Sequence, residues 1–277
     1  MVIGLGEAGR TLFDLLKESG QFTVFGLDTD ETKMREIGQR INGLQRKVDV
    51  MHICLPCDEK DKFISTVTGY AEKFSPKLLI INSTVPPRTT SGVSKNCACL
   101  VAHSPVRGVH KSIEHMKWEV KRWTKYIGGV NSKSAKAAEE HFLKLGLKTK
   151  VLKSPLETEL AKLFETTYRA WMIVCFQEMH RIARHFGARF NEVTDFLADT
   201  HRVRLDRPIM FPDVIGGHCV VPNVELLLQE YDSKLLRLIL ESNEKRKEEI
   251  KDKETKQEVE KVRRIVGDLQ KELMGKQ

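Results

Sequence analysis

The chain opens with Val2-Ile3-Gly4-Leu5-Gly6-Glu7-Ala8-Gly9, and this stretch decides the fold. Two apolar residues lead directly into three glycines spaced Gly-x-Gly-x-x-Gly, and a helical run of apolar residues begins near Thr11. This pattern is typical of a buried strand that turns sharply into a helix. It predicts the first strand and helix of an α/β domain.

The same glycines predict a phosphate site. Glycine lets a backbone approach a ligand closely, and a helix N-terminus offers its amide groups to a pyrophosphate. Asp28 follows nineteen residues after Gly9, at the end of the next apolar run. A carboxylate there can accept hydrogen bonds from both adenosine ribose hydroxyls and would repel a 2′-phosphate, so the predicted cofactor is NAD rather than NADP. The alternative is a glycine turn that serves helix packing alone.

Short apolar runs alternate with helical runs over the first half of the chain. Strands are expected at residues 22–27, 48–55, 78–81, 100–102, 126–129 and 149–152. This alternation predicts a doubly wound parallel sheet of the Rossmann type over residues 1–153. The carboxyl ends of parallel strands line the ligand crevice. The predicted cofactor-binding residues are therefore Gly4, Gly6, Glu7, Ala8, Gly9, Asp28, Leu55, Pro56 and Thr84.

A second region begins at Ser154-Pro155-Leu156-Glu157, which has the residues of a helix N-terminus with a capping box. The helical pattern continues to about Phe186 and ends at Gly187. A helix of this length predicts a domain crossing or a dimer core, with Trp171 buried between chains. We expect a helical dimerisation and substrate domain over residues 154–240. It includes an irregular loop from Arg202, and a charged helical tail over residues 241–277 follows it.

The 277 residues are 40% hydrophobic and 30% charged, with a net charge of +8. No apolar run approaches the roughly 20 residues of a membrane helix, so a cytoplasmic protein without membrane contact is expected. Basic clusters lie near residues 103–125 and 201–207 and predict an anionic partner. Nucleic acid is the less favoured partner, because aromatic residues do not alternate with the basic ones.

Six cysteines are spread along the chain in a pattern that does not suit a disulfide framework. Cys54-x-x-Cys57 and Cys97-x-Cys99 leave a split zinc site open as an alternative, but no metal is predicted. The remaining motif is Gly216-Gly217-His218-Cys219. A thiolate attacks carbonyl carbon well, and nearby cations favour the thiolate. Cys219 is therefore a predicted nucleophile, against the alternative of a buried structural thiol.

Four segments together resemble the UDP-glucose/GDP-mannose dehydrogenases, the nucleotide-sugar dehydrogenase family. They are residues 4–9 with Asp28, residues 83–87, Glu159-x-x-Lys162 and residues 216–219. The resemblance implies oxidation of a sugar alcohol by NAD, with a thiol that traps the aldehyde. It implies that Cys219 is the nucleophile, that Lys162 stabilises charge or transfers a proton, and that Thr84 positions water or substrate. It also implies that Arg202 helps to hold the substrate.

The sequence departs from the family pattern at several positions. Val106, Thr166 and Asn223 stand where the family has glutamate, asparagine and aspartate, and the C-terminal nucleotide-binding domain has no counterpart in residues 241–277. These departures suggest a short form that acts on an anionic sugar nucleotide, a sugar phosphate or a smaller hydroxy substrate. The predicted substrate-binding residues are Arg107, Arg202, Thr166 and Asn223. A homodimeric NAD-dependent oxidoreductase is the first hypothesis, and an NAD-binding sensor or assembly subunit without catalysis is the alternative.

Overall fold

The computed structural model describes residues 1–39, 47–108, 111–217 and 219–275, so His218, beside the predicted nucleophile, falls outside it. The chain forms two compact units, Met1–Leu163 and Phe164–Gln277. The predicted boundary at residue 153 precedes this division, which lies inside a long helix. Within the described ranges, no helix combines the length and the apolar character needed to cross a bilayer.

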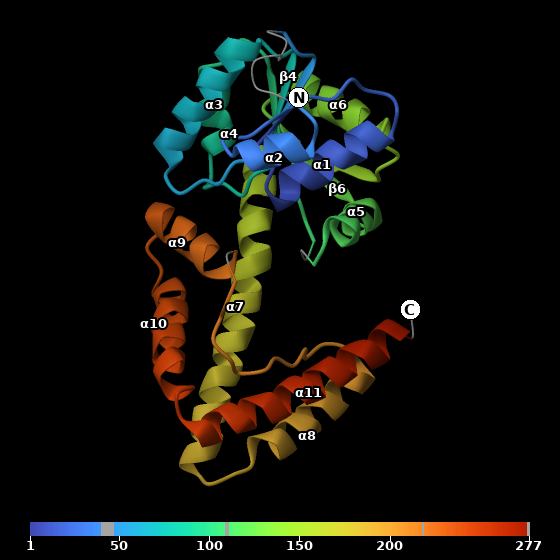
Figure 1. Cartoon of the computed structure of the whole chain (residues 1–277). Helices are drawn as coiled ribbons and strands as arrows, with labels where there is room; N and C mark the ends of the chain where they lie inside the picture. Colours follow the sequence, from blue (N-terminus) through green and yellow to red (C-terminus); the bar gives the residue numbers. More distant parts are fainter. Residues whose placement is uncertain (40–46, 109–110, 218, 276–277) are drawn as a thin grey trace. The chain divides into compact units, whose positions relative to one another are not determined.

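Unit 1 is built on a seven-stranded sheet in the order β2-β1-β3-β4-β5-β6-β7 (Figure 1). The strands are β1 (Val2–Ile3), β2 (Gly26–Leu27), β3 (Val50–Ile53), β4 (Leu78–Ile81), β5 (Leu100–His103), β6 (Lys125–Gly129) and β7 (Thr149–Val151). β1 pairs in parallel with both β2 and β3, and chain order reverses there. The predicted doubly wound α/β fold is confirmed, and the crevice at such a reversal is where ligands of these sheets bind.

Two details of the predicted sheet are wrong. β6 runs antiparallel to β5, so the sheet is mainly rather than wholly parallel. The strand expected at residues 22–27 is reduced to β2, an edge strand whose outer side is bound by the side chain of Gln39. Its amide nitrogen donates to the Val24 carbonyl oxygen at 2.8 Å, and its oxygen accepts from the Gly26 amide at 2.8 Å.

Helices cover both faces of the sheet, because successive strand residues point to opposite sides. Leu79 and Ile81 face one apolar cluster together with α3 (Lys60–Phe74) and α4 (Thr89–Lys95). Leu78 and Ile80 face a second cluster. That cluster includes residues of α1 (Glu7–Glu18), α5 (Ile113–Arg122) and α6 (Ser132–Leu143). α2 (Glu31–Glu36) adds Met34 to a smaller cluster with α1.

Unit 2 is helical and begins within α7 (Pro155–His185). It continues as α8 (Phe190–Arg204), α9 (Val220–Glu230), α10 (Lys234–Glu249) and α11 (Lys253–Gly275). The prediction that an irregular loop starts at Arg202 is wrong for its first residues, because α8 continues through Arg204. The expected division at residue 240 falls inside α10. α11 lies along α8, and its residues Val262, Val266 and Leu269 are buried there, so this segment is packed (Figure 1).

A buried arginine joins three helices of unit 2. Arg246 of α10 is wholly buried, and its Nη2 donates to the carbonyl oxygen of Gln177 on α7 at 2.9 Å. Its Nη1 lies 3.2 Å from Nδ1 of His180. Arginine only donates, so Nδ1 accepts and the opposite nitrogen, Nε2, donates to Glu258 of α11 at 2.9 Å. The chain of contacts ties α10 and α11 to α7.

Candidate active site

The glycine loop joins β1 to α1, and a side chain would meet different surroundings at each of its three glycines. Gly4 has φ +85°, and a Cβ there would lie 2.5 Å from the carbonyl oxygen of Cys54. A Cβ on Gly9 would collide with the Gly4 carbonyl oxygen. Nothing lies within 4 Å of a Cβ on Gly6, which is the N-cap of α1 and makes no side-chain cap. The loop therefore presents an open helix N-terminus of the kind that binds phosphate.

Asp28 lies against this loop, at the end of β2. Its Oδ2 accepts a hydrogen bond from the Leu5 amide at 2.6 Å, and its Oδ1 accepts one from the Asp30 amide at 2.9 Å. Burial alone would raise the pKa of Asp28, but these hydrogen bonds and the Lys33 ammonium, 3.5 Å from Oδ2, lower it below its ordinary value. The structure thus brings the predicted carboxylate to the predicted loop in its ionised form.

The segments that follow β3 and β4 border the same edge of the sheet. Leu55 and Thr84 are half-buried, and Pro56 is exposed. Glu159 of α7 is wholly buried and accepts hydrogen bonds from the amides of Arg88 at 2.6 Å and Thr90 at 2.8 Å. Burial raises the pKa of Glu159, although these bonds oppose the shift. Glu159 thereby fixes the segment after Thr84 to the helix that carries Lys162 one turn later.

His103, at the end of β5, is held in the same region. Its Nε2 lies 3.1 Å from the Ser83 carbonyl oxygen and therefore donates. Its Nδ1 lies 2.7 Å from the Thr158 hydroxyl, which also lies 2.9 Å from the Pro155 carbonyl oxygen. Burial lowers the pKa of His103 to about 3, so the ring is neutral at physiological pH. Both ring nitrogens of His103 therefore have partners, which makes it a satisfied polar residue at a strand end.

Lys125, the last residue of the basic cluster expected at residues 103–125, is buried beside these residues. Lys125 begins β6, and its Nζ donates to the carbonyl oxygens of Ser104 at 2.8 Å and Pro105 at 2.9 Å. Burial, together with the nearby cations Lys162 and Arg107, lowers the pKa of Lys125 to about 7. Three basic side chains thus interact near the end of β5, and their combined potential favours an anion.

The predicted residues Arg107 and Val106 belong to this segment. The Arg107 guanidinium lies over the rings of Trp123 at 4.8 Å and Tyr126 at 5.7 Å. Val106, which stands at the family's glutamate position, is buried in the apolar cluster that includes Met116. Because its side chain packs in the core, the position contributes apolar contact rather than a carboxylate.

The other predicted residues lie in unit 2 and are described within it. Cys219 is exposed at the N-cap of α9, so the alternative of a buried structural thiol does not hold. Asn223, one turn later, is buried and donates from Nδ2 to Oγ1 of Thr166 at 2.9 Å. Two predicted substrate-binding residues are therefore in direct contact. The third, Arg202, lies on α8, and its Nε pairs with Glu272 of α11 at 3.1 Å.

Helices of unit 2 hold the segment that leads to Cys219. The buried Asn243 of α10 accepts from the Ile215 amide at 2.7 Å and donates to the Ile215 carbonyl oxygen at 3.4 Å. Gln177 of α7 donates to the Asp213 carbonyl oxygen at 2.7 Å. Arg263 of α11 pairs with the Asp213 carboxylate. This backbone is fixed from three sides, which is the support that a positioned reactive group requires.

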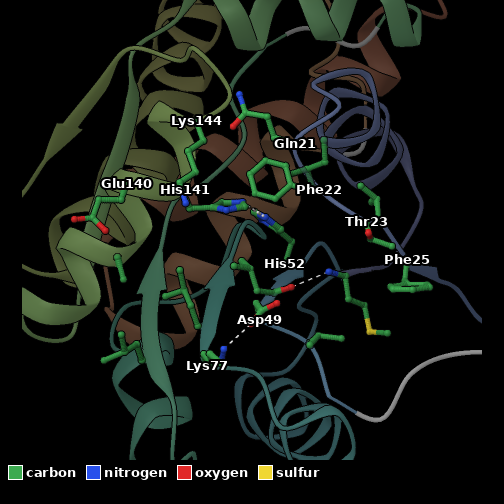
Figure 2. A pocket seen from close by; sticks show the side chains of 18 of the residues that line it. Gln21, Phe22, Thr23, Phe25, Asp49, His52, Lys77, Glu140, His141 and Lys144 are labelled. Carbon is green, nitrogen blue, oxygen red and sulfur yellow. Dashed lines mark hydrogen bonds and ion pairs between the residues drawn. The ribbon is translucent and has the colours of Figure 1, made fainter.

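A cavity of about 680 Å³ lies elsewhere in unit 1, and none of the predicted site residues lines it (Figure 2). Its walls come from the amino ends of the strands and from α6. His52 and His141 point toward each other there, with their Nε2 atoms 2.9 Å apart. Nδ1 of His52 faces Oδ1 of Asn82 at 2.9 Å and so carries the proton, which makes His141 the donor between the rings.

This histidine pair predicts a pH dependence of stability. Burial lowers the pKa of His52 well below its ordinary value and that of His141 to about 4. The neutral rings stabilise the fold fully above about pH 6.5, the pKa of unfolded histidine, and lose this contribution as the pH falls toward the folded values. We expect the thermal midpoint to fall more steeply between pH 6.5 and 4.5 in the native chain than in His141→Gln, which can still donate to His52. Parallel curves in thermal unfolding would contradict this assignment.

Within the described part of the chain, no three His, Cys, Asp or Glu side chains converge as a metal site would require. The two cysteine pairs of the open zinc alternative therefore do not form one ligand set there.

Comparison with known proteins gives a consistent result. Residues 156–245 match the family described as UDP-glucose/GDP-mannose dehydrogenase, central domain. The chain is 30% identical over 285 aligned positions to the UDP-N-acetyl-D-mannosamine dehydrogenase of Methanocaldococcus jannaschii. The alignment covers 88% of this chain and 64% of that protein, so the chain spans less than two thirds of this relative's length.

Solved structures show the same fold. The structure of UDP-D-ManNAc dehydrogenase from Pyrococcus horikoshii superposes with a TM-score of 0.69 at 24% identity, covering 88% of this chain and 68% of that one. The 3-hydroxyisobutyrate dehydrogenase of Mycobacterium tuberculosis superposes with a TM-score of 0.65 at 15% identity, covering 91% and 93% of the two chains. At these identities, the likeness concerns the fold alone.

Proposed function

We propose that this chain, which belongs to the UDP-glucose/GDP-mannose dehydrogenase family, is an NAD-dependent oxidoreductase that acts on the CH–OH group of a sugar nucleotide. One observation carries the cofactor assignment. The Asp28 carboxylate accepts from the Leu5 amide of a glycine loop whose helix N-terminus has no side-chain cap. That combination supplies amides for a pyrophosphate and a carboxylate for ribose hydroxyls. Glu7 and Ala8 begin the helix and complete the proposed cradle.

In the proposed reaction, three side chains have separate roles. NAD, when bound, accepts the hydride from the alcohol carbon. In the proposed roles, the Lys162 ammonium stabilises negative charge on the substrate oxygen, and Thr84 orients the substrate. The Cys219 thiolate would attack the aldehyde carbon, and the first turn of α9 favours negative charge at that position. Exposure of Cys219 at a helix N-cap supports this role.

The proposed substrate is anionic. Arg107, Lys125 and Lys162 supply positive potential in unit 1, and named relatives act on UDP-N-acetyl-D-mannosamine. Thr166 and Asn223 are proposed to contact the sugar as a hydrogen-bonded pair. Arg202 stays a predicted substrate ligand: Glu272 is paired with its Nε, and a guanidinium has further donors.

An NAD-reduction assay tests the proposal. We expect reduction with UDP-N-acetyl-D-mannosamine above UDP-glucose, GDP-mannose and small hydroxy acids, and with NAD above NADP. Lys162→Ala should lower the rate by roughly 100-fold or more, because an oxyanion would lose its cation. Cys219→Ser should stop acid formation, whereas Cys175→Ser, which changes another exposed cysteine, should not. NAD binding without reduction of any substrate would instead support the non-catalytic sensor or assembly subunit.

A homodimer through α7 is also proposed. Phe164, Tyr168, Ile182 and Phe186 are 52%, 56%, 51% and 78% exposed, and helical spacing places them along one stripe of α7. An apolar stripe of this kind is typical of a surface that another chain covers. Sedimentation velocity should give the mass of two chains, and Tyr168→Glu should shift it toward one.

A further inference from the structure

Asn82 follows β4 directly and has no part in the reaction proposed above. It is buried, and its backbone bonds to the ends of both neighbouring strands. Its amide donates to the Ile53 carbonyl oxygen at 2.8 Å, and its carbonyl oxygen accepts from the Val106 amide at 3.3 Å. Asn82 thereby joins the carboxyl ends of β3, β4 and β5. The segments that carry Thr84 and Arg107 start at the last two of these ends.

The side chain of Asn82 bonds to the same two neighbours. Its Nδ2 donates to the Ser104 carbonyl oxygen at 2.6 Å, and its Oδ1 faces Nδ1 of His52 at 2.9 Å. A carbonyl oxygen only accepts, so the contact with Ser104 fixes which way the amide points. His52 is itself held by His141, with 2.9 Å between their Nε2 atoms (Figure 2). The amide therefore cannot turn over without breaking two buried hydrogen bonds.

The Ser104 carbonyl oxygen accepts a second donor, Nζ of Lys125 at 2.8 Å. The two nitrogens share one oxygen, so Nδ2 of Asn82 and Nζ of Lys125 lie within two hydrogen-bond lengths of each other. Ser104 is fixed in turn, because its hydroxyl donates to the Tyr126 carbonyl oxygen at 2.7 Å and its amide donates to the Ile81 carbonyl oxygen at 2.8 Å. One immobile carbonyl group thus connects the buried amide to the buried amine.

Neutral groups hold the Lys125 amine. Its second acceptor is the Pro105 carbonyl oxygen at 2.9 Å, and Nζ lies 5.2 Å from the centre of the Phe142 ring. The titratable and charged groups that act on the amine from the surrounding elements are Arg107, Lys162, Cys54, His52 and His103. Burial keeps the thiol and both imidazoles of this set neutral near pH 7. These neighbours leave the positive charge of the ammonium uncompensated, so it can act on an anion.

We propose that Asn82 is a positioning residue for the candidate anion site: through the Ser104 carbonyl oxygen, it holds the Lys125 ammonium where its charge acts on the sugar nucleotide. This role rests on the proposed function. An amide suits the position because it donates to the carbonyl oxygen and adds no charge that would neutralise the ammonium. A carboxylate of nearly the same shape would only accept, and the ammonium would pair with it instead.

Asn82→Asp tests whether position 82 controls the ammonium. The pKa of Lys125, about 7 in the native chain, should rise by about one unit or more, because a nearby carboxylate favours the charged amine. NMR of chains that carry ¹³C at the lysine Cε follows this titration, and Lys125→Met identifies the signal by its loss. Asn131→Asp is the matched control. It adds the same charge at the N-cap of α6, where aspartate can still accept from the Ser134 amide, and it should leave the titration of Lys125 unchanged.

Steady-state NAD reduction gives the second readout. In Asn82→Asp, the KM for UDP-N-acetyl-D-mannosamine should rise about tenfold or more while kcat changes by less than about threefold, because the neutralised cation contributes to binding the anion. Loss of stability alone would not separate KM from kcat in this way. Asn82→Ala removes the donor without adding charge and should also raise KM, so it serves as the second variant if Asn82→Asp does not fold. Asn131→Asp should keep the native KM.

Two results would overturn the proposal. One is a Lys125 titration in folded Asn82→Asp that equals the native one. The other is a KM in the folded Asn82 variants that differs from the native value no more than that of Asn131→Asp does. The titration uses neither NAD nor substrate. If the native chain reduces NAD with none of the sugar nucleotides, the proposed function fails separately, and the titration still decides whether Asn82 holds the amine.

Discussion

Gly6→Ala should weaken NAD binding by more than tenfold while the fold stays intact, and Gly9→Ala should unfold much of unit 1. Gly6 has φ −66° and ψ −169°, which alanine adopts freely, and its Cβ would meet no protein atom within 4 Å. The methyl would instead fill the space through which a pyrophosphate approaches the backbone. A tenfold loss corresponds to about 1.4 kcal/mol of binding free energy.

Gly9 differs from Gly6 because a Cβ at this position would first meet backbone atoms of Gly4. A Cβ there would meet the Gly4 carbonyl oxygen and lie 3.0 Å from the Cys54 Cβ. Neither contact can be relieved by a rotamer change, so we expect a loss of about 3 kcal/mol or more in the free energy of unfolding. Isothermal titration calorimetry with NAD and thermal unfolding of both variants separate the two effects. Native-like NAD affinity in Gly6→Ala would remove the loop from the cofactor site.

Arg246→Met should destabilise unit 2 by about 3 kcal/mol. The side chain is wholly buried and donates to the Gln177 carbonyl oxygen and to His180, and its Nε pairs with Glu249 at 3.1 Å. Removing it leaves buried acceptors without a donor and a carboxylate with one fewer cation, which is costlier than losing an exposed pair. Burial already lowers the pKa of Arg246 to about 10.

The neighbouring Lys247 provides the matched control. It lies on the same helix, pairs with Glu244 and is half exposed, so Lys247→Met should change stability by no more than about 0.5 kcal/mol. Trp171 lies in unit 2, and the other two tryptophans lie in unit 1. Urea unfolding followed by Trp171 fluorescence in a Trp118→Phe, Trp123→Phe background reports on unit 2 alone. Equal midpoints for the two methionine variants would show that the buried network contributes little.

Local patterns predicted most of unit 1. β4 lies at the expected residues because Leu78–Ile81 is a continuous apolar run. The long helix begins directly after its predicted serine, and the Ser154 hydroxyl accepts from the Leu156 amide at 3.2 Å. The direction of β6 was not predictable, because an apolar run has the same pattern in either orientation. Its pairing is decided by contacts distant in sequence.

The residues of the candidate site also fall into predictable and unpredictable ones. The glycine loop and Asp28 were predictable, because both depend on spacing within a single βαβ unit. Lys125 and Arg246 were not, because a basic residue reads as exposed until tertiary contacts supply the carbonyl oxygens that bury it. The charged run of residues 241–277 gave the appearance of a tail for the same reason.

The orientation of β6 has a lasting effect on what the sheet can carry. Since β6 runs against β5, its first residue rather than its last stands next to Ser104 and Pro105. β7 pairs in parallel with β6, so both strands run against β1 to β5, whose first residues lie at the opposite rim. The reversal therefore brings the amine of Lys125 to a rim that β1 to β5 reach only with their final residues.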